Sequence, residues 1–127
     1  MSRIVSMTTK IRWPNADAFH RMLQKAADAM QEFYQKQTHI YRTHDFMFQV
    51  EIEGVPTITF SETPKKETAF YSYDSDRAGR NSLLYTDFLN ELSLVDLREQ
   101  AQRNKYRVQV NRIREEHKLA VVLERGM

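Results

Sequence analysis

Apolar residues occupy every second position on both sides of a turn in the middle of the chain. Residues 46–52 read FMFQVEI and residues 57–60 read TITF, with glycine and proline in the EGVP turn between them. Strict alternation places one set of side chains in a core and the other in water, and the turn reverses the chain. The pattern predicts an antiparallel hairpin, which residues 40–43 extend backwards.

Two other segments carry apolar residues at helical spacing. The first is predicted at residues 16–36 with Asn15 as N-cap, and its stripe is Phe19, Met22, Leu23, Ala26, Met30 and Phe33. The second stripe is Leu84, Phe88, Leu89, Leu92 and Val95. Ser93 followed by Asp96 predicts that a fresh helix begins there and runs to about residue 104.

Four further strands complete the expected fold. They are predicted at residues 3–12, 68–73, 106–110 and 118–124. Residues 119–123 read LAVVL, apolar on both parities, which predicts a central strand. We therefore expect a single α+β domain over residues 1–127, ferredoxin-like in general plan. Its mostly antiparallel sheet of five or six strands carries two helical segments packed on one face and leaves a polar opposite face open.

Composition narrows the class of protein. The chain of 127 residues is 41% hydrophobic and 28% charged, which is typical of a soluble globular protein. No long apolar run is present, so neither a membrane partner nor a secretory leader is expected, and cytoplasmic residence is predicted. The absence of cysteine excludes disulfides, thiol nucleophiles and cysteine zinc sites.

Positive charge is concentrated near the C-terminal end. Residues 103–125 hold seven Lys or Arg against three Glu, although the whole chain carries only +2. Such a segment could bind phosphate or an acidic protein surface. The alternative is a solvated hairpin with local ion pairs.

Motifs for catalysis or metal binding are missing or broken. His39 and His44 are five residues apart, which on a strand places them on opposite faces, and His44-Asp45 is interpreted as a strand kink. Residues 74–79 imitate the start of a calcium loop, but Tyr85 stands where a bidentate Glu belongs. We predict no catalytic residue, no metal site and no cofactor.

A nucleic-acid interface is an alternative carried by one aromatic strand. Residues 66–73, KETAFYSY, partly resemble the strand signature of RNA-recognition motifs, in which Phe70 and Tyr73 would stack on bases. Against this, the signature glycine is Glu67 and its first aromatic is Thr68. Phe70 in the protein core is the competing interpretation.

Tyrosine is frequent for so small a domain, and such amphipathic aromatics are enriched at interfaces. Half-buried packing in strands is the alternative. Together with basic side chains of the polar loop and the C-terminal hairpin, they give the candidate macromolecule-binding residues: Tyr41, Phe70, Tyr71, Tyr73, Arg77, Arg80, Arg107, Arg112 and Arg114.

The two ends of the chain resemble a family of unknown function. The start, MS followed by TTKI at residues 8–11, is similar to the hypothetical chloroplast reading frame 35 family, also called domain of unknown function 1257. So is the end, EQAQRN at 99–104, YRV at 106–108 and KLAVVL at 118–123, although this chain ends RGM where the family often places an aromatic. The resemblance implies a compact α+β fold and no catalytic residue.

These observations favour a non-enzymatic accessory or regulatory protein of a phage or bacterium that binds another macromolecule, most readily a protein. One alternative is a nucleic-acid binder that uses the aromatic strand and the basic C-terminal hairpin. Another is a homo-oligomer with a small-ligand or enzymatic site, which predicts a concave site with a perturbed titratable residue.

Overall fold

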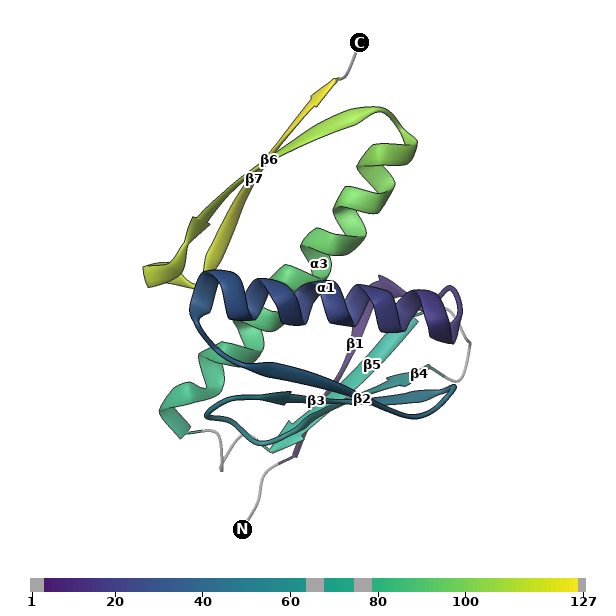
Figure 1. The fold of residues 1–127 in the computed structure, drawn as a ribbon, viewed down its shortest axis with the longest axis vertical. Coiled ribbons are helices and arrows are strands. Elements are labelled where there is room, and N and C mark those ends of the chain that lie inside the picture. Colours follow the sequence, from purple (N-terminus) through teal and green to yellow (C-terminus); the bar gives the residue numbers. More distant parts are fainter. Residues whose placement is uncertain (1–3, 64–67, 75–78, 126–127) are drawn as a thin grey trace.

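A computed structural model describes residues 4–63, 68–74 and 79–125 of the chain and has an α+β fold (Figure 1). Its helices are α1 (Ala16–Tyr34) and α3 (Leu83–Arg103), with short 3-10 turns η1 (Gly79–Ser82) and η2 (Arg114–Glu116). Its strands are β1 (Ile4–Arg12), β2 (Thr38–His44), β3 (Met47–Ile52), β4 (Ile58–Glu62), β5 (Thr68–Asp74), β6 (Tyr106–Ile113) and β7 (Lys118–Arg125).

Five strands form one antiparallel sheet in the order β1-β5-β4-β3-β2. Strands β2 to β5 follow one another as a meander, and β1 adds to the far side of β5. The predicted sheet of five or six antiparallel strands with two helical segments is confirmed. The ferredoxin-like plan is not, because four strands instead of two separate the helices.

Helix α1 begins as expected, because the Asn15 side chain accepts a hydrogen bond from the Ala18 amide at 2.8 Å. Its apolar stripe packs on the sheet and meets Phe48, Val50, Ile58 and Phe60 in one core. Trp13 closes this end of the core by stacking on Phe19, with ring centroids 4.1 Å apart.

Helix α3 is continuous, so the prediction of a fresh helix at Ser93 is wrong. Ser93 is exposed inside the helix, and Leu94 beside it is buried. The first half of α3 brings Tyr85, Phe88 and Leu92 into the core, and the helix then runs beyond the sheet (Figure 1). The second half is stabilised by packing on the C-terminal hairpin, which local sequence signals do not report.

Strands β6 and β7 pair only with each other in the described part of the chain and stand apart from the main sheet (Figure 1). The prediction that residues 119–123 form a central strand is therefore wrong. Val122 and Leu123 of β7 are 53% and 47% exposed, so the apolar run is not enclosed on both faces.

The sheet face away from the helices is polar, as predicted. Its register aligns Tyr41, Gln49, Thr59 and Ser72 on neighbouring strands, and Tyr41 is 48% exposed. Tyr71 lies on the opposite face, where it is buried beside Phe60. Tyr71, predicted as a binding residue, is therefore not available on the open face, because the alternation of β5 turns it inward with Ala69.

Candidate functional site

Two carboxylates lie buried one turn apart on α3, at the base of the C-terminal hairpin. Asp87 is 2% exposed and Glu91 is 1% exposed. A carboxylate this deeply buried is costly unless a cation or a hydrogen-bond donor compensates it. Both groups find such partners, and most of those partners come from the hairpin.

Glu91 accepts three hydrogen bonds from Arg112 of β6. The Arg112 Nη2 to Glu91 Oε1 distance is 2.7 Å, and Arg112 Nε lies 3.2 Å from each Glu91 oxygen. The Tyr34 hydroxyl also donates to Glu91 at 3.3 Å. Burial and the Glu91 charge raise the pKa of Tyr34 to about 12. The Arg112 guanidinium also lies 3.5 Å from the centre of the Phe33 ring. The ion pair with Glu91 and a cation–π contact with Phe33 therefore both fix its position.

Asp87 contacts His117, the residue between η2 and β7. Both Asp87 oxygens lie 3.0 Å from His117 Nδ1, and Asn90 of α3 donates to the His117 carbonyl at 3.0 Å. Burial raises the pKa of the Asp87 carboxyl, and the hydrogen bond and charge of His117 lower it in part. His117 thus compensates Asp87 and fixes the turn of the hairpin on α3.

Arg114 of η2 adds a third attachment by donating to the Phe33 carbonyl at 2.6 Å. We call the set Asp87, Glu91, Arg112, Arg114 and His117 the hairpin anchor. All three anchor residues of the hairpin lie at or next to its turn. At the opposite end, the backbone amides of residues 104 and 105 donate to carbonyls of α3.

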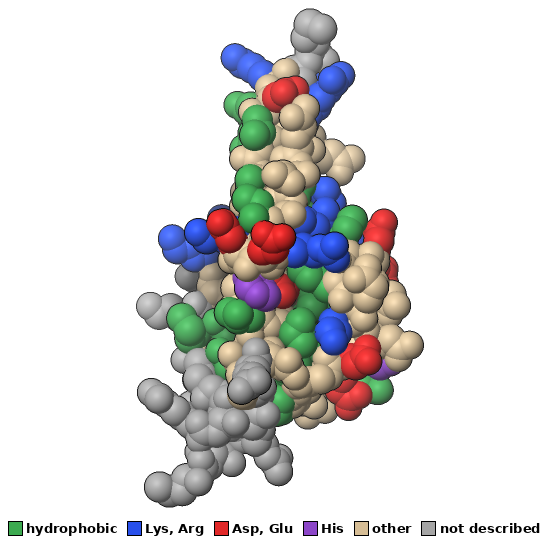
Figure 2. All heavy atoms as spheres, turned by 90° about the vertical axis from the view of Figure 1, so that its left-hand side faces the viewer, with side chains coloured by type: hydrophobic (Ala, Val, Ile, Leu, Met, Phe, Trp, Pro, Cys, Tyr) green, Lys and Arg blue, Asp and Glu red, His purple; other side chains and the backbone are tan. Residues whose placement is uncertain are grey.

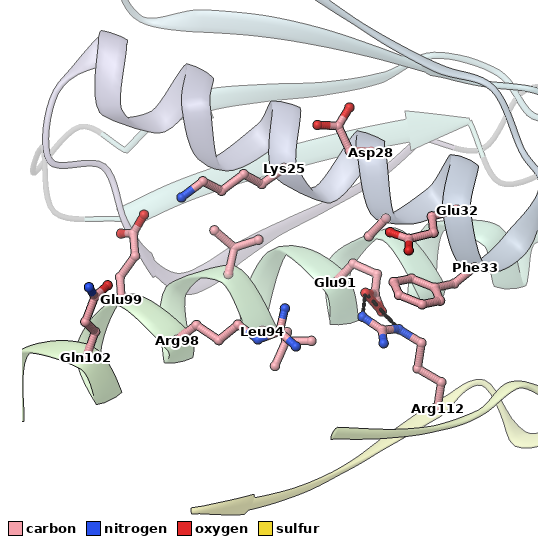
Figure 3. A pocket seen from close by; sticks show the side chains of 12 residues that line it. Lys25, Asp28, Glu32, Phe33, Glu91, Leu94, Arg98, Glu99, Gln102 and Arg112 are labelled. Atoms are coloured by element: carbon pink, nitrogen blue, oxygen red, sulfur yellow. Dashed lines mark hydrogen bonds and ion pairs between the residues drawn. The ribbon is translucent and has the colours of Figure 1, made fainter. Parts of the chain in front are cut away.

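Two clefts flank the line along which the hairpin meets α3. The first has a volume of about 390 Å³ and lies between α1, α3 and β6 (Figure 3). Its floor includes Ala29, Leu94 and Val95, and charged side chains surround it: Lys25, Asp28, Glu32, Glu91, Arg98, Glu99 and Arg112. The second, of about 370 Å³, lies between α3 and β7, and Leu94, Leu97, Leu119 and Val121 line it with His117 and neighbouring polar residues.

The hairpin turns an apolar face toward α3, and Leu119 and Val121 of this face line the second cleft. Cross-strand partners share a face, and the register pairs Val108 with Leu123 and Val110 with Val121. Helix α3 covers this face only in part, because Leu123 is 47% exposed and Tyr106 is 41% exposed. Figure 2 shows hydrophobic side chains along one flank of the projecting upper part of the molecule.

The structure disperses the predicted binding residues. Arg112 and Arg114 belong to the hairpin anchor, Tyr71 is in the core, and Tyr73 stacks on Tyr85 with centroids 4.0 Å apart. Tyr41 and Arg107 are exposed, but on the main sheet and on the hairpin respectively. Arg77 and the side chains of Phe70 and Arg80 lie outside the described residues.

Sequence reasoning missed the two buried carboxylates and the role of His117. Asp87 and Glu91 stand at i and i+4 among Tyr85, Phe88 and Leu92, so the helix is buried on more sides than one apolar stripe indicates. A pair of acidic residues inside such a stretch was the available signal. Its basic partners lie 21 and 30 residues further along the chain, and no local pattern identifies them.

Comparison with known proteins gives no match from which a family or a function could be inferred. No protein-family model, no curated protein and no solved structure matches this chain. The resemblance to the chloroplast reading frame 35 family thus stays a prediction. Among the described residues no helix is long and apolar enough to span a membrane, and no group of three or more acidic, His or Cys residues could hold a metal ion.

Proposed function

We propose that this protein is a non-enzymatic accessory protein that binds a segment of another protein in the cleft between α1, α3 and β6. The observation that carries the proposal is the cleft itself. Ala29, Leu94 and Val95 give it an apolar floor, and charged side chains surround it, among them Arg112 of the anchored hairpin. An apolar floor with charged residues around it is the composition of a protein-binding surface.

The charges around the cleft favour a protein over a nucleic acid. Four acidic side chains, Asp28, Glu32, Glu91 and Glu99, outnumber three basic ones. Without the Glu91–Arg112 pair, three acidic side chains remain against two basic ones. A phosphate backbone would meet net repulsion here. The aromatic strand offers little support either, because Tyr71 and Tyr73 pack with the core.

Site-specific photo-cross-linking tests the proposal in the cells that make the protein. A photoreactive amino acid at Gln102, which lines the cleft, is expected to capture one protein reproducibly. The same group at Gln49, exposed on the polar sheet face, is the matched control and is expected not to capture it. Equal capture from both positions, or recovery of nucleic acid that dissociates as salt rises, would overturn the proposal.

A cleft-filling variant provides the second readout. Ala29→Arg places a long side chain over the apolar floor and is expected to abolish the Gln102 cross-link. Gln31→Arg adds the same charge at an exposed position on the same helix and is expected to retain it. Helical content measured by circular dichroism should be unchanged in both.

One observation supports the alternative of an enzymatic or small-ligand site. Asp87 holds His117 through Nδ1, which leaves Nε2 as a proton acceptor or donor, and His117 lines the second cleft beside Ser93 and Thr86. Native mass spectrometry of gently purified protein distinguishes this alternative. A small bound mass that is retained by the unmodified protein and lost in His117→Ala would favour it over protein binding.

A further inference from the structure

Both edges of the main sheet are protected against pairing with another strand. Edge strand β1 has a register shift between Thr8 and Arg12, and edge strand β2 has one between Arg42 and His44. Irregularities and charged side chains of this kind are how natural sheets avoid edge-to-edge association. Strand β2 ends at His44 and residues 45–46 form a turn, so the position interpreted as a strand kink is the end of this edge strand.

Strand β7 lacks this protection. It pairs with β6 in continuous register over all eight residues, and its other edge meets no strand in the described ranges. Its centre reads LAVVL without proline, and its charged side chains stand only near its ends. A two-stranded hairpin is marginally stable alone and gains from further strands, so this edge is suited to accept one.

The sequence of β7 is complementary to itself in one antiparallel register. Residues directly opposite one another in an antiparallel pair lie on the same face, so a two-fold axis must pass beside a residue of β7. With the axis at Val121, Lys118 faces Glu124 of a second copy, Leu119 faces its Leu123, and Ala120 faces its Val122.

Neighbouring registers lose this match. With the axis at Val122, Leu119 faces Arg125 and Ala120 faces Glu124, so each charge meets an apolar residue. With the axis at Ala120, Lys118 faces Val122 and Glu124 lies beyond the strand's partner. The Val121 register alone forms two pairs of opposite charge and keeps apolar residues together, and such pairs stabilise sheets.

We propose that two copies of this chain associate through β7, in antiparallel register about Val121, to form the continuous sheet β6-β7-β7-β6. Since α3 packs on the apolar face of each hairpin, both α3 helices would cover the same face of the new sheet. The Leu119 and Leu123 pairs would extend the apolar layer beside the second cleft across the two-fold axis. The partner segment of the first cleft would bind at the β6 side, away from this interface.

Charge exchange tests both the interface and its register. Size-exclusion chromatography with light scattering should show the mass of the unmodified protein rising with concentration from 15.1 kDa toward twice that value. In a dimer of Lys118→Glu, Glu faces Glu at both positions where residue 118 meets residue 124. In a dimer of Glu124→Lys, Lys faces Lys at the same two positions, so each variant should dimerise at least about tenfold more weakly. An equimolar mixture of the two variants restores both opposite-charge pairs and should recover the dimer.

Matched controls carry the same charge changes elsewhere on the hairpin. Lys105→Glu and Glu115→Lys lie outside β7 and should dimerise like the unmodified chain. Glu124→Lys places a lysine opposite Arg107 of its own hairpin, which could disturb the hairpin itself. Recovery of the dimer on mixing would show that both β7 variants are still folded.

Three outcomes would overturn the inference: a mass of 15.1 kDa at every concentration, a dimer that neither variant weakens, or variants that do not rescue each other. Failure here is separable from failure of the proposed function. Ala29→Arg should still dimerise, and monomeric Lys118→Glu should still give the Gln102 cross-link.

Discussion

Arg112 is the residue on which the buried charge of Glu91 depends. Its guanidinium binds both carboxylate oxygens and lies against Phe33, so it is held by contacts with both helices. Removing one member of a buried pair leaves the other charge without compensation, which costs far more than the pair contributes on its own.

We expect Arg112→Met to lower the free energy of unfolding by about 3 kcal/mol, because it leaves the Glu91 carboxylate buried beside an apolar side chain. The double variant Glu91→Leu/Arg112→Met should recover most of that loss. Urea denaturation measures both. Arg107→Met, at an exposed position of the same strand, should change the value by less than about 0.5 kcal/mol. Equal losses for the two Arg variants would contradict this account of Glu91.

The Asp87 carboxyl predicts an unusual dependence of stability on pH. Because burial raises its pKa in the folded state, ionised Asp87 disfavours folding, and this penalty is relieved as pH falls through that raised pKa toward the unfolded value of 3.8. His117→Ala removes the group that lowers this pKa, so the pKa should rise further. The variant should be less stable at neutral pH, by about 1–3 kcal/mol, and the difference should shrink as Asp87 protonates.

Thermal unfolding of both proteins between neutral and acid pH measures the effect. The matched control is His39→Ala, an exposed histidine on β2. A His117→Ala deficit that stays constant over the whole acid range would mean that Asp87 is not the group it compensates.

At the scale of elements, the N-terminus of α1 is fixed by the Asn15 cap, a local contact that the sequence predicts. Asn15→Ala removes the acceptor for the Ala18 amide and should lower the free energy of unfolding by about 1 kcal/mol. Asn15→Asp retains an acceptor at the cap and should stay close to the unmodified protein. Chemical denaturation distinguishes the two, and equal loss in both would show that the cap contributes nothing.

Local signals of this kind explain how much of the fold the sequence could predict. Alternation located the strands of the central hairpin, and helical spacing together with Asn15 located α1, because those elements each bury one face against one neighbour. Sequence reasoning failed for α3 and β7. Ser93 resembles a cap but lies within a helix whose two halves pack on different partners, and residues 119–123 resemble a central strand but form an edge.

The site was harder to predict than the fold. Its carboxylates are on α3, its cations are on the final hairpin, and the Tyr34 donor is on α1, so only the tertiary structure brings them together. Basic residues near the C-terminal end were recognised as a feature. What the sequence could not show is that Arg112 and Arg114 are used within the molecule.

For the whole molecule, the anchor at one end predicts that the hairpin opens more readily than the sheet. The amides of β6 and β7 should exchange with deuterium through local opening at a lower free energy than those of β3 and β4, whose side chains Phe48, Val50, Ile58 and Phe60 are in the core. Hydrogen exchange followed by mass spectrometry measures this. Arg112→Met lowers global stability and should therefore speed exchange in both regions, with the hairpin remaining the faster one. Equal exchange rates in the hairpin and in β3 would contradict a separate unit.

The residues of the hairpin anchor are not all synthesised at the same time. The helices and strands that form the core precede residue 104, whereas the partners of Glu91 and Asp87 lie at residues 112 and 117. At synthesis rates of 5–20 residues per second, the stretch from residue 106 to 125 takes on the order of 1–4 s. The partners of both carboxylates are therefore the last parts of this site to be made, and the buried charges can be compensated only after the hairpin has been synthesised.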